Sequence, residues 1–152
     1  MIDIERDDLS RPSVRALVAE HLADMHDTSP PESVHALGLD ALREPAVTVW
    51  TAWGDGQLLG CGALKELAVD AGEIKSMRTA ASARGRGVGA AVLTFLLDEA
   101  HRRGYRRVSL ETGTQDYFAA ARRLYERHGF TSCPPFGDYL PDPNSAFFTR
   151  SL

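Results

Sequence analysis

A glycine-rich stretch in the middle of the chain constrains the fold most strongly, because it joins an alternating segment to an amphipathic one. Its sequence is Arg84-Gly85-Arg86-Gly87-Val88-Gly89. Glycines at alternate positions let a ligand approach the backbone N–H groups closely, because no Cβ atom stands in the way. A helix that begins at such a loop attracts anions to its N-terminus, and the two arginines add positive charge. The stretch therefore predicts a pyrophosphate site, with a plain glycine-rich turn before a helix as the alternative.

Length and composition limit the classes of protein to consider. A chain of 152 residues with 43% hydrophobic residues fits one compact domain that covers residues 1–152. The net charge of −4 argues against a general nucleic-acid-binding protein, so the two arginines suit a small phosphorylated ligand better. The two cysteines and five histidines have no metal-ligand spacing, which predicts no metal site. The sequence shows no apolar span of membrane length and no signal peptide, so we expect no membrane association and a cytoplasmic location.

The pattern of apolar residues predicts an α/β fold built around one mixed sheet. Strands are expected at residues 2–5, 47–53, 57–69, 73–79, 107–111, 130–133 and 146–150. Helices are expected from the cap Ser10 to residue 28, over 32–42 with an interruption at Gly38, from 88 to 103, and over 116–128. Strands two to four would form an antiparallel meander, and strand five would lie parallel to strand four because a helix connects them.

Three motifs together indicate a family. Arg84-x-x-Gly87-x-Gly89, Ala121-x-x-Leu124-Tyr125 and Gly129-Phe130 resemble the GCN5-related N-acetyltransferase (GNAT) superfamily, and the flanks at 29–38 and 136–139 resemble a poorly characterised branch of small bacterial members. The resemblance implies a single GNAT-like domain with about seven strands, splayed strands four and five, and about four helices. It also implies that acetyl-CoA is the cosubstrate and that the acetyl group passes directly to the amine of a small molecule or peptide. A homodimer is left open.

The resemblance further implies which residues bind acetyl-CoA. The cosubstrate would enter where the fourth and fifth strands splay apart, with its pantetheine arm pairing to the backbone of Met77 and Thr79. Unpaired backbone at a splayed strand needs such a partner. Many family members have an Asn where this chain has Phe118, so that side-chain contact is not carried over. The pyrophosphate would lie on the N–H groups of Arg84, Gly85, Arg86, Gly87, Val88, Gly89 and Ala90.

Acetylation of an amine needs a proton acceptor, because a primary amine with a pKa of about 10.4 is mostly protonated at neutral pH. Glu73 lies eleven residues before Arg84, the spacing at which histone-type family members carry a glutamate base. Period-two alternation places Glu73 on the same strand face as Lys75, Met77 and Thr79. We therefore predict Glu73 as the general base, with a solvated carboxylate paired to Lys75 as the alternative.

Three further groups have predicted roles in the chemistry. Glu111, at the end of the fifth strand, is the rival general base, with a salt bridge to Lys75 or an arginine as its alternative. Tyr125 stands where the family has its general-acid tyrosine, and a phenol can protonate the departing thiolate. Its alternative is simple packing on the apolar face of its helix. A backbone amide of the fourth strand, at or near Met77, would polarise the thioester carbonyl.

The acceptor is expected to contact two segments, residues 32–42 and 136–144. The candidate contacts are Glu32, His35, Lys75, Asp138 and Tyr139. Acidic groups there would favour a cationic amine, whereas Lys75 and nearby arginines would equally suit an acceptor that carries a carboxylate.

Two other functions stay open at this point. A non-catalytic acyl-CoA-binding module would keep the glycine loop without turnover. A Rossmann dinucleotide-binding enzyme is also considered, because Gly85-x-Gly87-x-x-Ala90 fits the fingerprint and Glu111 lies about twenty residues further on. The predicted antiparallel meander before the loop argues against the Rossmann alternative.

Overall fold

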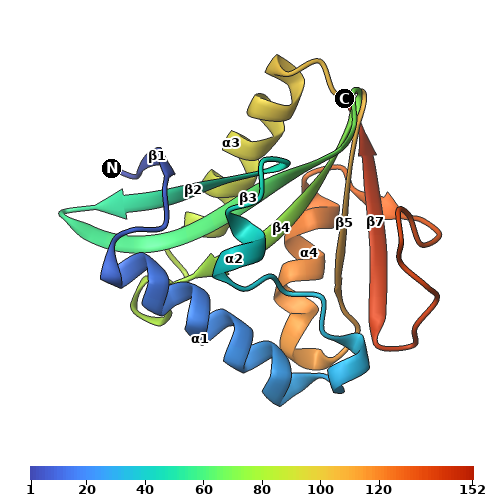
Figure 1. Cartoon of the computed structure of the whole chain (residues 1–152), viewed down its shortest axis with the longest axis horizontal. Coiled ribbons are helices and arrows are strands. Elements are labelled where there is room, and N and C mark those ends of the chain that lie inside the picture. Colours follow the sequence, from blue (N-terminus) through green and yellow to red (C-terminus); the bar gives the residue numbers. More distant parts are fainter.

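The computed structural model describes all 152 residues and shows one seven-stranded sheet with helices on both faces (Figure 1). The strand order is β1-β2-β3-β4-β5-β7-β6. The strands are β1 (Asp3–Asp7), β2 (Val47–Gly54), β3 (Gln57–Ala68), β4 (Ala71–Thr79), β5 (Arg107–Gly113), β6 (Thr131–Ser132) and β7 (Ser145–Ser151). The helices are α1 (Pro12–Thr28), α2 (Leu39–Leu42), α3 (Val88–Arg102) and α4 (Ala119–Arg127). Short 3-10 turns are η1 (Pro31–Ser33), η2 (Ala81–Ala83) and η3 (Asp116–Phe118).

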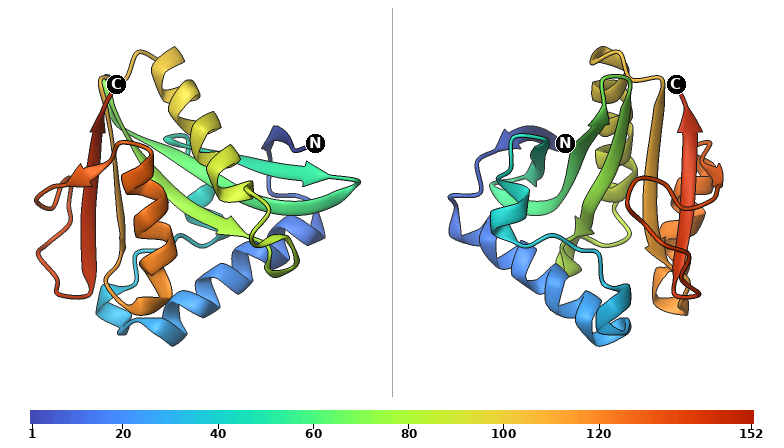
Figure 2. Two further views of the ribbon diagram at one scale, coloured as in Figure 1. Left: turned by 180° about the vertical axis from the view of Figure 1, so that it is seen from behind. Right: turned by 45° about the vertical axis from the view of Figure 1, so that its right-hand side comes forward.

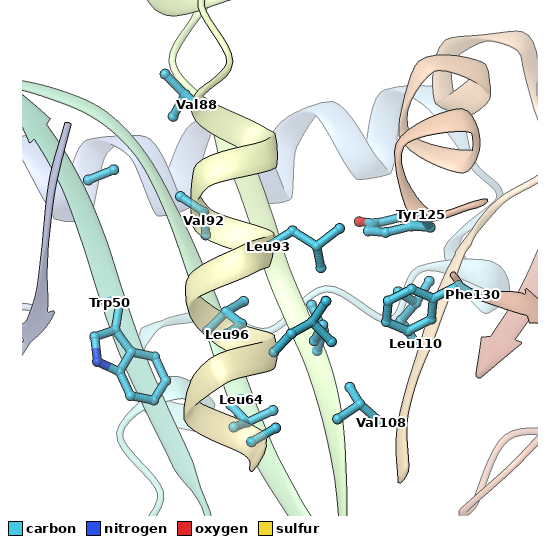
Figure 3. Close-up of a cluster of buried hydrophobic side chains, with 14 of the residues drawn as sticks. Trp50, Leu64, Val88, Val92, Leu93, Leu96, Val108, Leu110, Tyr125 and Phe130 are labelled. Carbon is cyan, nitrogen blue, oxygen red and sulfur yellow. The ribbon is translucent and has the colours of Figure 1, made fainter. Parts of the chain in front are cut away.

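Helices α3 and α4 cover one face of the sheet, and α1 and α2 lie on the other (Figures 1 and 2). The larger core packs beneath α3, whose buried residues recur at helical spacing through Val88, Val92 and Leu96 (Figure 3). A smaller core lies on the opposite face, around Val14 and Val18 of α1. Because the sheet is covered on both faces, β2 is buried along nearly its whole length.

Strands β4 and β5 are paired over only a short distance. They run parallel and pair Ala71–Ile74 with Arg107–Leu110. Beyond these four pairs β4 turns away, and Figure 2 shows the two strands meeting at one end and separating toward the other. The predicted antiparallel meander of β2 to β4 and the splayed fourth and fifth strands are confirmed. In the opening beyond these pairs, the backbone groups of β4 and β5 form no hydrogen bonds with each other.

A β-bulge interrupts β4 in the middle of the splayed segment. The pairs on either side leave Ser76 and Met77 opposite the single residue Gly62 of β3. Ser76 has a φ of 55°, in the left-handed region that non-glycine residues rarely occupy. The extra residue reverses the alternation of side chains along the rest of the strand.

The predicted common face of Glu73, Lys75, Met77 and Thr79 is therefore wrong. Glu73 and Lys75 lie on the face covered by α1 and the segment after it, whereas Met77 packs against the core beneath α3. Arg78 takes the position on the α1 face and binds carboxylates of that helix. A one-residue insertion has no signal in the alternating sequence, so strict period two misplaces every side chain after it.

Three helical boundaries also differ from the predictions. Arg11, not Ser10, is the N-cap residue of α1, because the Ser10 hydroxyl donates to Asp8 instead. The expected helix over 32–42 is a 3-10 turn, an extended segment and the four-residue α2. Ser33 there donates to Asp142 at 2.6 Å, and this tertiary contact draws the segment toward the C-terminal loop. The expected helix over 116–128 begins as the 3-10 turn η3 before α4.

Candidate active site

The glycine loop presents free backbone donors at the start of α3. Gly85 and Gly87 have φ values of 76° and 78°, and Gly87 is the N-cap residue. No side chain caps the helix, and its first turn holds no acidic residue. None of the N–H groups of residues 84–87 donates to a carbonyl in the protein. These unpaired donors at a helix N-terminus fit a pyrophosphate group.

A cavity of about 440 Å³ occupies the opening between β4 and β5. Along β4 it extends from Glu73 to Thr79, and at the loop it includes Arg84 and Gly89. Its other walls come from α1, residues 33–36, the end of β5, and α4. The cavity thus connects the free donors of the glycine loop with the carboxylates at the closed end of the splay.

Glu73, Lys75 and Tyr139 form one hydrogen-bonded cluster at that end. The Tyr139 hydroxyl donates to the Glu73 carboxylate at 2.5 Å, and Lys75 Nζ donates to the same carboxylate at 3.2 Å and to the Tyr139 oxygen at 2.8 Å. Burial, followed by the neighbouring Glu73 charge, raises the pKa of Tyr139. The His35 ring packs edge-on against Tyr139 at 4.9 Å. The structure therefore brings four of the predicted residues together, including the ion pair given as the alternative for Glu73.

Glu111 has a different environment on the neighbouring strand. It forms no ion pair, and its side-chain partner is the Ser145 hydroxyl, which donates at 2.7 Å. Burial raises the pKa of Glu111 to about 6, against the opposing effects of Ser145 and the Lys75 charge. A carboxyl group with this pKa exchanges a proton close to neutral pH, as a general base requires.

Tyr125 lines the same cavity from α4. The ring is 7% exposed and packs against Phe130 with 5.9 Å between ring centroids, and Figure 3 shows it extending from α4 toward α3. Burial and then the Glu111 charge raise the pKa of Tyr125 to about 12. The phenol is therefore protonated at neutral pH and positioned in the cavity wall.

Comparisons with known proteins agree with this arrangement. The sequence profile described as the acetyltransferase (GNAT) family matches residues 14–130. This chain belongs to the GNAT acetyltransferase family. The uncharacterized N-acetyltransferase YsnE of Bacillus subtilis is 55% identical over 98% of this chain and 99% of that protein. The uncharacterized N-acetyltransferase YedL of Escherichia coli is 50% identical over 100% of this chain and 96% of that protein.

A solved structure gives the same fold with a ligand. The GNAT family acetyltransferase from Elizabethkingia anophelis, with acetyl-CoA bound, superposes with a TM-score of 0.73 at 18% identity and covers 99% of this chain and 98% of that chain. The chain is an N-acetyltransferase of the GNAT family. The Rossmann alternative is wrong, because the glycine loop follows an antiparallel meander. None of the helices is both long and apolar enough to cross a bilayer.

The other residues predicted for the acceptor lie elsewhere. Glu32 and Asp138 are exposed and do not line the acetyltransferase cavity. Ser33 of η1 lines the cavity and donates to Asp142, and Tyr139 contacts the cavity residues Lys75 and Glu73. The sequence of a surface loop does not distinguish an acidic residue that faces the cavity from one that faces solvent.

A buried arginine in the cavity wall was not predicted from the sequence. Arg78 binds Glu20 and Asp24 of α1, with 2.5 Å to Asp24 Oδ2, and donates to the Tyr117 hydroxyl at 3.3 Å. Its side chain is only 5% exposed. His21 of the same helix has a pKa lowered to about 4 by burial and then by the Arg78 charge. Glu20 and Asp24 are four residues apart and therefore lie on one face of α1. Two carboxylates on one helix face indicate a cation opposite them, and this was the signal in the sequence that could have predicted Arg78.

Proposed function

We propose that this acetyltransferase transfers the acetyl group directly to a small-molecule amine, with Glu111 as the general base and Tyr125 as the general acid. The observation that carries the choice of base is the contrast between the two carboxylates in the cavity. Glu73 already accepts hydrogen bonds from an ammonium and a phenol. Glu111 accepts one from a hydroxyl and has its pKa raised to about 6.

This contrast reverses the order of the two candidates. The Glu73 carboxylate is already bound by Lys75 and Tyr139, so a contact with the acceptor ammonium would have to compete with these two hydrogen bonds. Glu73 instead orders Lys75 and the Tyr139 loop at the end of the cavity. Glu111 removes the proton from the acceptor ammonium, and the neutral amine then attacks the thioester carbonyl.

The departing thiolate needs a proton, and Tyr125 supplies it. Tyr125 belongs to the cavity wall, and its pKa of about 12 keeps it protonated until the thiolate forms. The bulge at Ser76 supports the third requirement, which is polarisation of the thioester carbonyl. It turns the backbone of β4 inside the splayed segment, where an amide at or near Met77 would be the donor.

The cosubstrate is held by the chain's own backbone. The free N–H groups of the glycine loop receive the pyrophosphate, and Arg84 and Arg86 add charge-assisted contacts. The backbone of Met77 and Thr79 in the splayed part of β4 pairs with the amide chain of pantetheine.

Release of free thiol from acetyl-CoA over a panel of amines tests the proposal. We expect Glu111→Gln to lower kcat/KM by about 10²-fold or more and to remove the acidic limb of the pH profile near pH 6. Glu73→Gln should retain that limb. If Glu111→Gln retains the acidic limb of the pH profile and Glu73→Gln loses it, Glu73 is the general base. Binding of acetyl-CoA without thiol release for any amine would favour the non-catalytic module.

A homodimer and a cytoplasmic location stay predictions. Light scattering of the purified protein at several concentrations measures the first, and cell fractionation with an antibody measures the second. Peptides with a free N-terminus belong in the acceptor panel, since a peptide acceptor is the second candidate class.

A further inference from the structure

Charged side chains in the cavity wall divide into two groups by position. Five charged residues line the cavity: Glu73, Lys75, Arg78, Arg84 and Glu111. Arg84 belongs to the glycine loop, where the phosphates of the cosubstrate are expected. The other four line the cavity on the α1 face of β4 and at the end of β5, a region that we call the acceptor end, and their pairing decides which charge an acceptor can bring.

Both cations at the acceptor end are already paired within the chain. Lys75 binds Glu73 at 3.2 Å, and the side chains of these two residues are 10% and 4% exposed. Arg78 binds the carboxylates of Glu20 and Asp24 and is 5% exposed. An acceptor carboxylate at either cation would lie beside a carboxylate of the protein, and the repulsion would offset the attraction.

The histidines of this wall add no positive charge at neutral pH. Burial lowers the pKa of His21 to about 4, and burial followed by the Lys75 charge lowers the pKa of His35. Of the two carboxylates, Glu73 is neutralised by Lys75, whereas Glu111 forms no ion pair and is bound by the Ser145 hydroxyl. The acceptor end thus contains one unpaired negative group and no unpaired positive one.

We propose that the acceptor is a cationic amine that carries no carboxylate next to its amino group, so that amines are acetylated in preference to the corresponding amino acids. The inference rests on the proposed function and adds the substrate class. The ammonium group is attracted by Glu111, to which it also gives its proton. A carboxylate on the neighbouring carbon would enter the same partly buried end without a cationic partner, which carries a large desolvation penalty.

Matched acceptors test the substrate class. Phenylethylamine, phenylalaninamide and phenylalanine share one side chain and differ in the group beside the amine, and agmatine and arginine form a second set. Initial rates are compared per concentration of free amine, because the three amino groups differ in pKa. We expect kcat/KM for phenylethylamine and the neutral amide to exceed that for phenylalanine by about 10²-fold or more, mainly through KM. Equal values for amide and acid would overturn the inference and leave the acetyltransferase assignment intact.

An added cation gives the decisive variant. Val34 lies in the acceptor wall, and Val34→Lys places an unpaired cation there, while Val34→Met is the control of similar length. We expect Val34→Lys to reduce the preference for phenylethylamine over phenylalanine at least 10-fold and Val34→Met to leave it unchanged. Lys75→Met serves as the opposite test. A rise in KM for phenylalanine alone in this variant would mean that Lys75 holds an acceptor carboxylate, and the inference would then be wrong.

Discussion

Replacement of the proposed base should make the protein less active and more stable at the same time. Glu111 is a partly buried carboxyl group whose pKa is raised from 4.5 to about 6, chiefly by burial. A raised pKa means that the folded state binds the proton more tightly than the unfolded chain does. The folded state is therefore favoured while Glu111 is protonated, and this advantage is lost as the pH rises from 4.5 through 6.

The magnitude follows from the difference between the two pKa values. A change from 4.5 to about 6 corresponds to about 2 kcal/mol of stability lost above pH 6. Because the side chain retains some contact with solvent, we expect Glu111→Gln to recover about 1–2 kcal/mol at pH 8. For a chain of 152 residues this is a rise in Tm of about 2–8 °C. The gain should disappear near pH 4, where the native carboxyl group is protonated in both states.

Urea unfolding of Glu111→Gln and the native protein, measured from pH 4 to pH 8, gives the free energies of unfolding. Glu73→Gln is the matched control, because it removes one negative charge from the neighbouring strand β4. It should destabilise the protein by about 3–5 kcal/mol, because buried Lys75 loses its counter-ion. A Glu111→Gln protein that is no more stable than the native one at pH 8 would show that the Glu111 charge is not penalised. Glu111 would then lack the raised pKa that we expect of the base.

Four further changes test other parts of the site. Gly87→Val should remove most of the rise in Tm that acetyl-CoA produces, because valine rarely adopts the φ of 78° and its side chain would block the N–H groups. The control Gly56→Val, at a φ of 76° in a remote turn, should keep the rise. Arg84→Ala should weaken CoA by about 1.5–3 kcal/mol and leave a pantetheine fragment without phosphates unaffected in calorimetry, and an equal loss for both ligands would place the arginine elsewhere. Tyr125→Phe should lower kcat at least 10-fold at unchanged acetyl-CoA affinity, and an unchanged kcat would reduce the residue to packing. Tyr139→Phe, which loses the donor to Glu73, should raise KM for the acceptor while the thermal shift by acetyl-CoA stays the same.

Features that depend on neighbouring residues in the chain could be predicted. The glycine loop and the start of α3 follow from glycines at alternate positions before an amphipathic segment. The parallel pairing of β4 and β5 follows from the connecting helix. A motif on one helix predicted Tyr125 as a site residue, and Tyr125 lies in the cavity wall.

Features that depend on packing between distant segments could not be predicted. The φ of 55° at Ser76 has no signal in the sequence, because serine does not favour this conformation. The pairing of Glu73 with Tyr139 and of Glu111 with Ser145 depends on where a long loop and the last strand return to the sheet. Two carboxylates that looked similar in the sequence therefore have different hydrogen-bond partners, which distant segments of the chain supply.

The short contact between β4 and β5 has a mechanical consequence. Four residue pairs join strands β1–β4 to the group β5, β7 and β6, so the sheet consists of two plates with a narrow hinge. A molecule that fills the opening, pairs with the backbone of one plate and contacts the other restrains the motion of the two plates about that hinge. Resistance to heat, protease and amide exchange in both plates should then follow the supply of acetyl-CoA, so the lifetime of the protein in a cell becomes linked to its own substrate.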